Sequence, residues 1–279
     1  MKRLPHLLAL ATTVLLSGCA GVPRPGVTAT VTPAAPPATQ NPQAPAPLDI
    51  IGNWQLTAVS TVASSPPLTF AGSLGQVGTA ASGALHVDGS TCFDRLSIMG
   101  LTGTVTTGTT SLTSTTLNGQ VVTFTGTFSD AGFTGTYSVN GGCDAGDQGL
   151  LSGIRITLSD ADAWSGTFTS AQQKFNASGS FAQANSPSSD GSLGITGTAT
   201  FDTPCFSAQA LSPGSFPSGS FLLGNVVSLQ IATGNGTVSF VGTVDPSTEF
   251  ITGTYNVAGG TCDQTGTAVV ALGGQWDYH

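Results

Sequence analysis

The chain has 279 residues, which fits one large domain or two small ones at about 150 residues per domain. Glycine supplies 38 residues, and the 39% of hydrophobic residues are enough for a core, which excludes a chain that is disordered as a whole. Six basic residues against 14 acidic ones give a net charge of −8, which excludes a basic nucleic-acid interface and a polybasic membrane patch.

The first 18 residues have the layout of a signal peptide. Lys2 and Arg3 precede an apolar run from Leu7 to Leu16. A run of about ten residues is too short to cross a hydrocarbon core of about 30 Å, so residues 1–18 are predicted to be a signal peptide. Leu16-Ser17-Gly18-Cys19 follows, and this order of parts resembles the N-terminus of a bacterial lipoprotein.

The lipoprotein resemblance implies that Cys19 carries acyl chains such as palmitate and becomes the new N-terminus. Each buried CH₂ contributes about 0.8 kcal/mol, so several chains hold a protein on a membrane without a transmembrane helix. The expected location is the bacterial cell envelope, on the outer membrane in a Gram-negative cell, facing the periplasm or the cell surface. An ordinary secretory signal followed by a chance cysteine is the alternative.

Residues 19–48 are predicted to be a disordered linker between the lipidated cysteine and the folded part. Proline removes a hydrogen-bond donor and fixes φ, which disfavours helix and sheet and favours polyproline II. The prolines of this segment are Pro23, Pro25, Pro33, Pro36, Pro37, Pro42, Pro45 and Pro47. The linker is therefore interpreted as a tether.

The rest of the chain is interpreted as two copies of one domain, residues 49–158 and 159–279. Trp54 recurs as Trp164, and the pair Cys92-Phe93 recurs as Cys205-Phe206. Further repeated segments are Thr134-Gly135-Thr136-Tyr137 with Thr252-Gly253-Thr254-Tyr255, and Asn140-Gly141-Gly142-Cys143-Asp144 with Gly259-Gly260-Thr261-Cys262-Asp263. A period of this size indicates a duplicated domain and not a solenoid of short repeats.

Each copy is predicted to be all-β. Residues 122–128 and 133–139 alternate strictly between apolar or glycine positions and threonine or serine positions, which is typical of a hairpin. Asn118-Gly119 is a candidate type I′ turn. The turn signals predict about seven or eight short strands per copy, and the outer faces are threonine and serine with almost no charge.

Glycine recurs on the apolar side of the predicted strands, where it permits strong curling and close approach of a facing aromatic ring. The positions are Gly103, Gly126, Gly135, Gly197, Gly242 and Gly253. We therefore expect two tandem small antiparallel domains that are barrel-like, with a sandwich as the alternative.

Four cysteines remain in an exported chain, so disulfides are expected. They allow three pairings, and repeat equivalence favours Cys92–Cys143 and Cys205–Cys262, one clamp for each copy. Zinc is the rival, but the sequence has no C-x₂-C motif and no paired histidines.

No catalytic, metal or cofactor site is predicted. His86 and Asp88 share one strand face, but His86 has no counterpart in the second copy and no G-x-S-x-G elbow occurs. Acidic residues gather at Asp144/Asp147 and Asp160/Asp162 without EF-hand spacing, so we interpret them as solvated turn carboxylates, with an irregular calcium site as the alternative.

Gly52-Asn53-Trp54 is similar to the start of lipocalin-like barrels, and the resemblance implies at most a small calyx. Two functions remain open. We expect a lipid-anchored, non-enzymatic envelope module with a structural or adhesive role and no cofactor; the alternative is lipocalin-like binding of a small apolar ligand inside the barrels. The sequence leaves the oligomeric state open. An interior cavity above roughly 300 Å³ lined by aromatic residues would favour binding, and a filled interior would favour the structural role.

The end of the chain repeats the start of each copy, because Gly274-Gln275-Trp276 follows the pattern of Trp54 and Trp164. We expect Trp276 to be largely buried and to pair with a strand of the second copy, which would remove an exposed sheet edge. By the same reasoning, the strand that contains Trp164 would close the first copy.

Overall fold

The computed structural model describes residues 48–62, 66–94, 97–158, 163–248 and 250–273. All of them belong to one compact unit that spans residues 45–279. The described residues form strands, turns and loops, and none of them forms a helix that could cross a membrane. Cys19 and the expected linker, Asp160/Asp162 and Trp276 lie outside the described residues.

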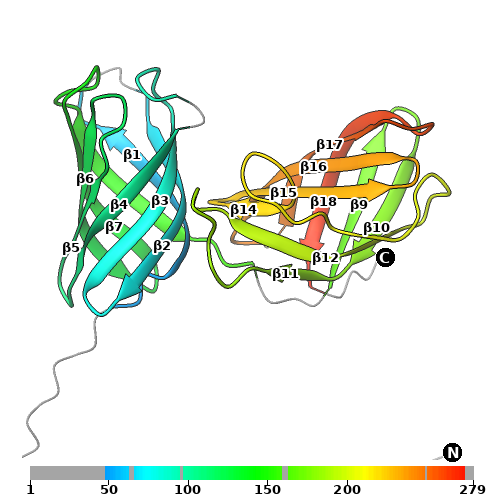
Figure 1. Cartoon of the computed structure of the whole chain (residues 1–279), viewed down its shortest axis with the longest axis horizontal. Helices are drawn as coiled ribbons and strands as arrows, with labels where there is room; N and C mark the ends of the chain where they lie inside the picture. The colour runs from blue at the N-terminus through cyan, green and yellow to red at the C-terminus, as the bar shows by residue number, and fades with distance from the viewer. Residues whose placement is uncertain (1–47, 63–65, 95–96, 159–162, 249, 274–279) are drawn as a thin grey trace, which may run out of the picture. The chain divides into compact units, whose positions relative to one another are not determined.

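The first copy is a closed antiparallel barrel in which eight strands pair in chain order (Figure 1). The closing pair joins β1 to β8, from Trp54 opposite Arg155 to Ser60 opposite Gly149. The strands are β1 Gly52–Ser60, β2 Leu68–Val77, β3 Ala80–Asp88, β4 Ile98–Val105, β5 Thr110–Ser114, β6 Val121–Ser129, β7 Gly132–Asn140 and β8 Gln148–Arg155. We call this ring barrel one.

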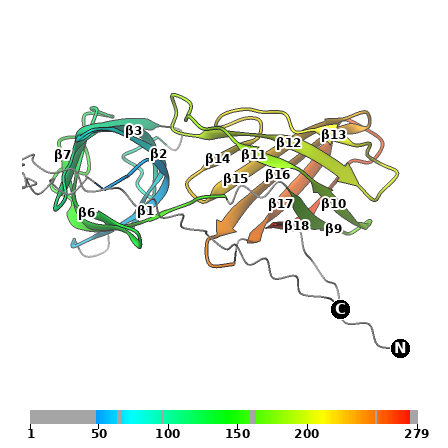
Figure 2. The same cartoon turned by 90° about the horizontal axis from the view of Figure 1, so that it is seen from below.

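The second copy forms its own ring, barrel two, seen as a separate set of strands in Figures 1 and 2. Eight strands follow one another around it as β9, β10, β12, β14, β15, β16, β17 and β18, with β11 and β13 paired to β12. The strands are β9 Trp164–Ser170, β10 Lys174–Gly179, β11 Phe181–Gln183, β12 Leu193–Phe201, β13 Gln209–Ala210, β14 Phe221–Leu223, β15 Val226–Thr233, β16 Gly236–Asp245, β17 Phe250–Ala258 and β18 Gln264–Leu272.

The predicted all-β fold with two tandem barrels is confirmed, but the expectation about the closing strand of the first copy was wrong. Barrel one is closed by β8, and the strand that begins at Trp164 pairs with β10 and β18 of its own copy. Trp54 and Trp164 lie in the first strand of each ring, and each ring is closed where this first strand pairs with the last strand of the same copy. Barrel two is likewise closed by β18, so closure provides no reason for Trp276 to pair with it.

Aromatic side chains fill both interiors, which decides between the cavity and the filled interior that the sequence left open. In barrel one, Phe70 and Phe124 meet edge to face at 5.0 Å between ring centroids, and Trp54 meets Phe128 at 4.8 Å. In barrel two, Phe168 lies 5.1 Å from Phe175, and Tyr255 contacts both rings. These rings are all at most 5% exposed, so each barrel has a packed core.

Glycines on the inner side allow two backbones to approach closely, at equivalent places in both barrels. Gly126 stands opposite Gly135, and Gly242 stands opposite Gly253. A Cβ at Gly126 would lie 2.7 Å from the ring of Phe133, and one at Gly242 would lie 2.6 Å from the ring of Phe240. The predicted close approach of aromatic rings to inner-face glycines is therefore confirmed at both pairs.

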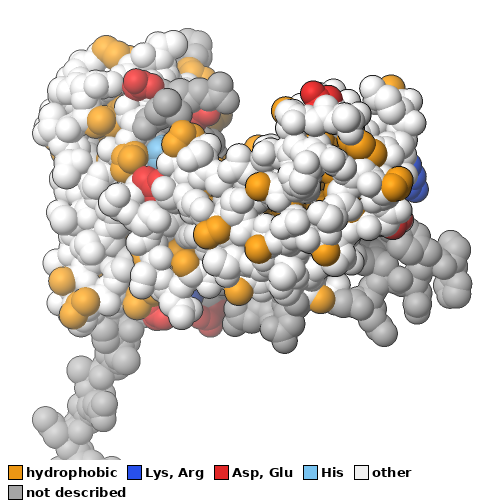
Figure 3. All heavy atoms as spheres, turned by 45° about the vertical axis from the view of Figure 1, so that its right-hand side comes forward, with side chains coloured by type: hydrophobic (Ala, Val, Ile, Leu, Met, Phe, Trp, Pro, Cys, Tyr) orange, Lys and Arg blue, Asp and Glu red, His pale blue; other side chains and the backbone are white. Residues whose placement is uncertain are grey.

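On the face drawn in Figure 3, charged side chains are few and apolar side chains are scattered. Threonine and serine occupy the outward positions of many strands; on β6 and β7, for example, Thr125 faces Thr136 and Thr127 faces Thr134. This agrees with the predicted outer face.

Candidate functional site

Each barrel has one end that carries its disulfide. Cys92 is bonded to Cys143 and Cys205 to Cys262, with Cα atoms 5.8 Å and 5.9 Å apart, so both predicted pairings are present. Pairing within each copy means that each barrel carries its own clamp. The sulfurs of Cys92 and Cys143 lie near the Asp144 carboxylate, but disulfide sulfurs are not thiolate ligands, so this group is no metal site.

An asparagine side chain fastens a turn to the disulfide in both copies. Asn118 donates from its amide to the carbonyl of Cys92 at 3.2 Å, and Asn235 donates to the carbonyl of Cys205 at 2.8 Å. Positive φ angles at Asn118 (52°) and Gly119 (78°) fit the predicted type I′ turn. The sequence predicted the Asn118-Gly119 turn. Its counterpart, Asn235-Gly236, was missed, although it follows Cys205 at a spacing similar to that of Asn118 from Cys92.

The acidic pair at this end of barrel one is bonded within the protein. Asp144 accepts a hydrogen bond from the Ser90 hydroxyl at 2.6 Å, and Asp147 accepts from Ser60 at 2.5 Å and from Tyr137 at 2.8 Å. Burial and the bond to Asp147 raise the pKa of Tyr137 to about 12. These carboxylates, which the sequence presented as solvated, are half-buried and fasten neighbouring strands.

His86 and Asp88 do not form a catalytic pair. Both ring nitrogens of His86 are buried and lack a hydrogen-bond partner within the described part of the chain, whereas a general base has to hold a nucleophile. The ring lies 4.3 Å from that of Phe216, and burial lowers the pKa of His86 against the opposing effect of the Asp190 carboxylate. His86 is therefore a packing residue where the two copies meet.

His86 belongs to a surface that we call the acceptor face, the outward side of the first three ring strands. In barrel one, Gln55, Ala71 and His86 stand side by side on β1, β2 and β3. In barrel two, the same positions on β9, β10 and β12 are Ser165, Ser178 and Thr200. The equivalence follows from register, because Trp54 and Trp164 precede Gln55 and Ser165 and face Gly72 and Gly179.

Barrel two covers the acceptor face of barrel one. The amide of Asn53 donates to the carbonyl of Gly224 at 2.6 Å, and its oxygen accepts from the Gly224 N–H at 2.7 Å. The Ser73 hydroxyl donates to the carbonyl of Gly191 at 2.7 Å. Asn53 and Ser73 point outward from barrel one, yet each is only 2% exposed. Asn53 and Ser73 are thus paired with backbone groups of barrel two, as buried polar groups require, whereas the ring nitrogens of His86 on the same face lack a partner among the described residues.

Glycine is needed at both contacts. A Cβ at Gly224 would lie 2.6 Å from the Cβ of Ala71, and one at Gly191 would lie 2.1 Å from the carbonyl oxygen of Ala84. Both glycines also have positive φ, +55° and +84°, which other residues rarely adopt.

We call the end of the barrel that carries these turns its glycine-turn end. In barrel two this end carries the β11–β12 connection and the β14–β15 turn, and in barrel one it carries the β2–β3 and β4–β5 turns.

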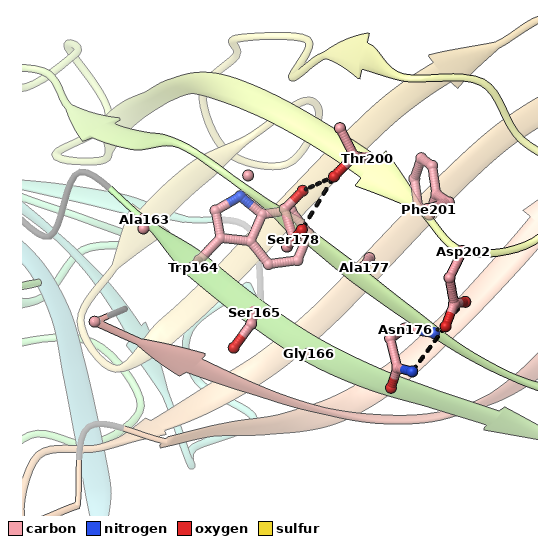
Figure 4. Close-up of a pocket in the computed structure, with 12 residues that line it drawn as sticks. Ala163, Trp164, Ser165, Gly166, Asn176, Ala177, Ser178, Thr200, Phe201 and Asp202 are labelled. Carbon is pink, nitrogen blue, oxygen red and sulfur yellow. Dashed lines mark hydrogen bonds between the residues drawn. The ribbon is translucent and has the colours of Figure 1, made fainter. Parts of the chain in front are cut away.

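The acceptor face of barrel two instead lines an open hollow of about 710 Å³ (Figure 4). Ser178 and Thr200 share a hydrogen bond at 3.0 Å on its wall, and Asn176 donates from its amide to Asp202 at 2.8 Å. Trp164 and Phe201 contribute apolar surface, and the Trp164 indole donates to the carbonyl of Thr198 at 3.0 Å. The hollow has a mixed lining, in which the hydroxyls of Ser165, Ser178 and Thr200 lie beside apolar groups, and the sequence did not predict it.

Comparison with known proteins provides no name for this architecture. No protein-family model matches the chain, and neither a curated protein nor a solved structure matches it significantly. The fold itself defines the class: a tandem pair of disulfide-clamped, closed antiparallel β-barrels with packed interiors.

Proposed function

We propose that the protein is a lipid-anchored module of the bacterial cell envelope, with a structural or adhesive and non-enzymatic role. The observation that carries the structural role is the filled interior of both barrels, where contacting aromatic rings occupy the space that a calyx would leave open. The hollow described above lies on the outward face of barrel two and not inside a barrel. Contacts of the protein with its surroundings would therefore use the outer surface of the barrels and not their interiors.

The proposed location is supported by two independent features. Leu16-Ser17-Gly18-Cys19 after a short apolar run resembles a lipoprotein signal. Two disulfides within the folded part fit an oxidising compartment outside the cytoplasm. The membrane would then be a partner through the acyl chains on Cys19.

The anchor is tested by Cys19→Ala in the native host. The wild-type chain is expected to partition into the detergent phase with an acyl mass on its N-terminal peptide, and Cys19→Ala to leave that phase. Ser17→Thr, a small change beside the cysteine, is a control that should preserve partitioning. A Cys19→Ala chain that partitions like the wild type and keeps an acyl mass would refute the anchor and leave the structural role standing.

Lipocalin-like binding of a small apolar ligand is the alternative. It has one supporting feature, the chain order of the eight strands in barrel one, which up-and-down lipocalin barrels share. The buried aromatic cores weigh against it. Native mass spectrometry of the chain purified from its own cells distinguishes the two, because the structural role predicts the mass of the modified chain alone, and the alternative predicts an added ligand released on unfolding.

A further inference from the structure

The contact between the two copies is of a kind that one chain cannot complete. The glycine-turn end of barrel two occupies the acceptor face of barrel one through Gly191 and Gly224. A contact between two different surfaces of a repeated unit leaves one surface of each kind unused. Among the described residues, the surfaces without such a partner are the glycine-turn end of barrel one and the acceptor face of barrel two.

The two glycine turns at this end of barrel one carry no charged residue, and within the described part of the chain they are open. Gly78 lies in the β2–β3 turn and Gly108 in the β4–β5 turn, and a Cβ at either would meet nothing within 4 Å. Gly78 has a positive φ of +60°, as does Gly191 (+84°) in the equivalent β11–β12 connection of barrel two. Val77 beside it is 84% exposed, the highest exposure among the large hydrophobic residues that are described.

The acceptor face of barrel two fits such an end chemically. Its hollow of about 710 Å³ has room for a turn and an aliphatic side chain, with Phe201 and Trp164 as apolar lining. Ser178 and Thr200 carry hydroxyls that can bond to backbone groups of a turn, as Ser73 does to Gly191 in the internal contact. The carboxylate of Asp202 accepts hydrogen bonds from the backbone N–H and the side-chain amide of Asn176, so both of its oxygens already have a partner within barrel two.

We propose that the acceptor face of barrel two binds the glycine-turn end of barrel one from a second copy of the chain, which joins molecules head to tail. The internal contact is the reason to favour a barrel over a small polyhydroxylated ligand, because the equivalent face of barrel one already binds glycine turns of a related barrel. A heterologous contact of this kind extends into a ring or a filament. The inference deepens the proposed structural role, and it does not depend on the lipid anchor.

Sedimentation velocity over a range of concentrations tests the proposal. The full chain with Cys19→Ala is used so that association cannot arise from shared lipid. Its average mass should rise with concentration beyond that of a dimer. Val77→Arg should block the glycine-turn end of barrel one, and Thr200→Arg should block the acceptor face of barrel two. Each variant alone should therefore stay monomeric. Val241→Arg, at an outward position of β16 that is 51% exposed, is the matched control and should associate like the parent.

Mixing the two variants provides the sharpest readout. Val77→Arg keeps an intact acceptor face and Thr200→Arg keeps an intact glycine-turn end, so a one-to-one mixture should form heterodimers and no larger species. Ser178→Arg should replace Thr200→Arg in this role, which guards against local damage at one position. A parent chain that stays monomeric, a Val77→Arg chain that associates like the parent, or a mixture that stays monomeric would each overturn the proposal. None of these outcomes bears on membrane anchoring.

Discussion

Barrel one and barrel two each have an aromatic core of the same kind, but they differ in their second strand. In barrel one, β2 is continuous and pairs with β3 over nine residue pairs. In barrel two, the corresponding backbone is divided into β10 and β11, which pair with β12 over two and three residue pairs. The continuous sheet offers a smooth face that barrel two covers, whereas the divided one borders the hollow. The duplication thus preserved what close packing constrains and diverged on the outside.

The polar group beside the disulfide differs as well. In barrel one, the carboxylate of Asp147 accepts hydrogen bonds from both Ser60 and Tyr137. In barrel two, the amide oxygen of Gln264 accepts from Ser170 at 2.7 Å, while the Tyr255 hydroxyl and the Gln264 amide nitrogen are buried without a partner in the described part of the chain. Beside its disulfide, barrel two therefore bears the cost of two unpaired buried polar atoms, which the hydrogen bonds of Asp147 avoid at the equivalent place in barrel one.

Loss of a disulfide should lower the free energy of unfolding more than any other change proposed here. The loss should be equal in the two barrels, because the bonded cysteines are a similar distance apart in the sequence, 51 and 57 residues. Replacing Cys92 and Cys143 by alanine should lower the free energy of unfolding of barrel one by about 4 kcal/mol, and the equivalent change at Cys205 and Cys262 should cost barrel two as much. Differential scanning calorimetry measures both. An effect confined to one barrel would contradict the equivalence of the clamps.

The covered face should be sensitive to a methyl group that the free end tolerates. Gly224→Ala adds an overlap with Ala71 to the strain of a positive φ, whereas Gly78→Ala has the same strain in open space. Gly224→Ala should cost about 1–3 kcal/mol more than Gly78→Ala, since overpacking adds to the strain. Chemical unfolding followed by circular dichroism gives the two values; equal losses would mean that Gly224 is not packed against barrel one.

Removing the side-chain acceptor beside the disulfide, Asp147 or Gln264, should destabilise barrel one more than barrel two. Asp147→Ala leaves the hydroxyls of Ser60 and Tyr137 without their acceptor and should cost about 1–3 kcal/mol. Gln264→Ala removes one bond to Ser170 but also a buried unpaired nitrogen, so its cost should be smaller. The same unfolding assay compares them, and the reverse order would contradict the pairing described for Asp147.

A histidine on the acceptor face, which only barrel one has, should add a loss of stability in mildly acidic solution. The pKa of His86 is lowered by burial, so the folded chain binds fewer protons there than the unfolded chain. The stabilisation is present above about pH 6.5, the unfolded value, and is lost as the pH falls below it. His86→Phe should remove this part of the loss between pH 7 and 5. A wild type and a His86→Phe variant with parallel stability curves would contradict the buried, neutral state of His86.

At the opposite end of the pH range, the same logic applies to Tyr137. Its pKa is raised to about 12 in the folded chain, so the unfolded chain loses the hydroxyl proton first, and stability should fall as the pH rises from about 10 towards 12. Tyr137→Phe should remove this decline. Urea unfolding at pH 9.5 and 11 measures it, and an unchanged decline in Tyr137→Phe would assign it to another group.

The sequence predicted what depends on local patterns. Alternation identified the strands, inner-face glycines indicated curled barrels, and repeat equivalence paired Cys92 with Cys143 and Cys205 with Cys262. The covered face could not be predicted, because Asn53, Ser73 and His86 have the spacing of ordinary outward residues, and period-2 alternation does not show what packs against an outer face. The hollow depends on the division between β10 and β11, which alternation does not reveal either.

Carbethoxylation of His86 measures whether barrel two covers the acceptor face of barrel one in solution. Diethyl pyrocarbonate modifies exposed imidazole, and peptide mapping reports His86 separately from the two other histidines of the chain. His86 is 7% exposed, so it should react much more slowly in the native chain than in the unfolded chain, and Gly224→Ala should raise its native rate. Native His86 that reacts as fast as in the unfolded chain would show an uncovered face and contradict the account.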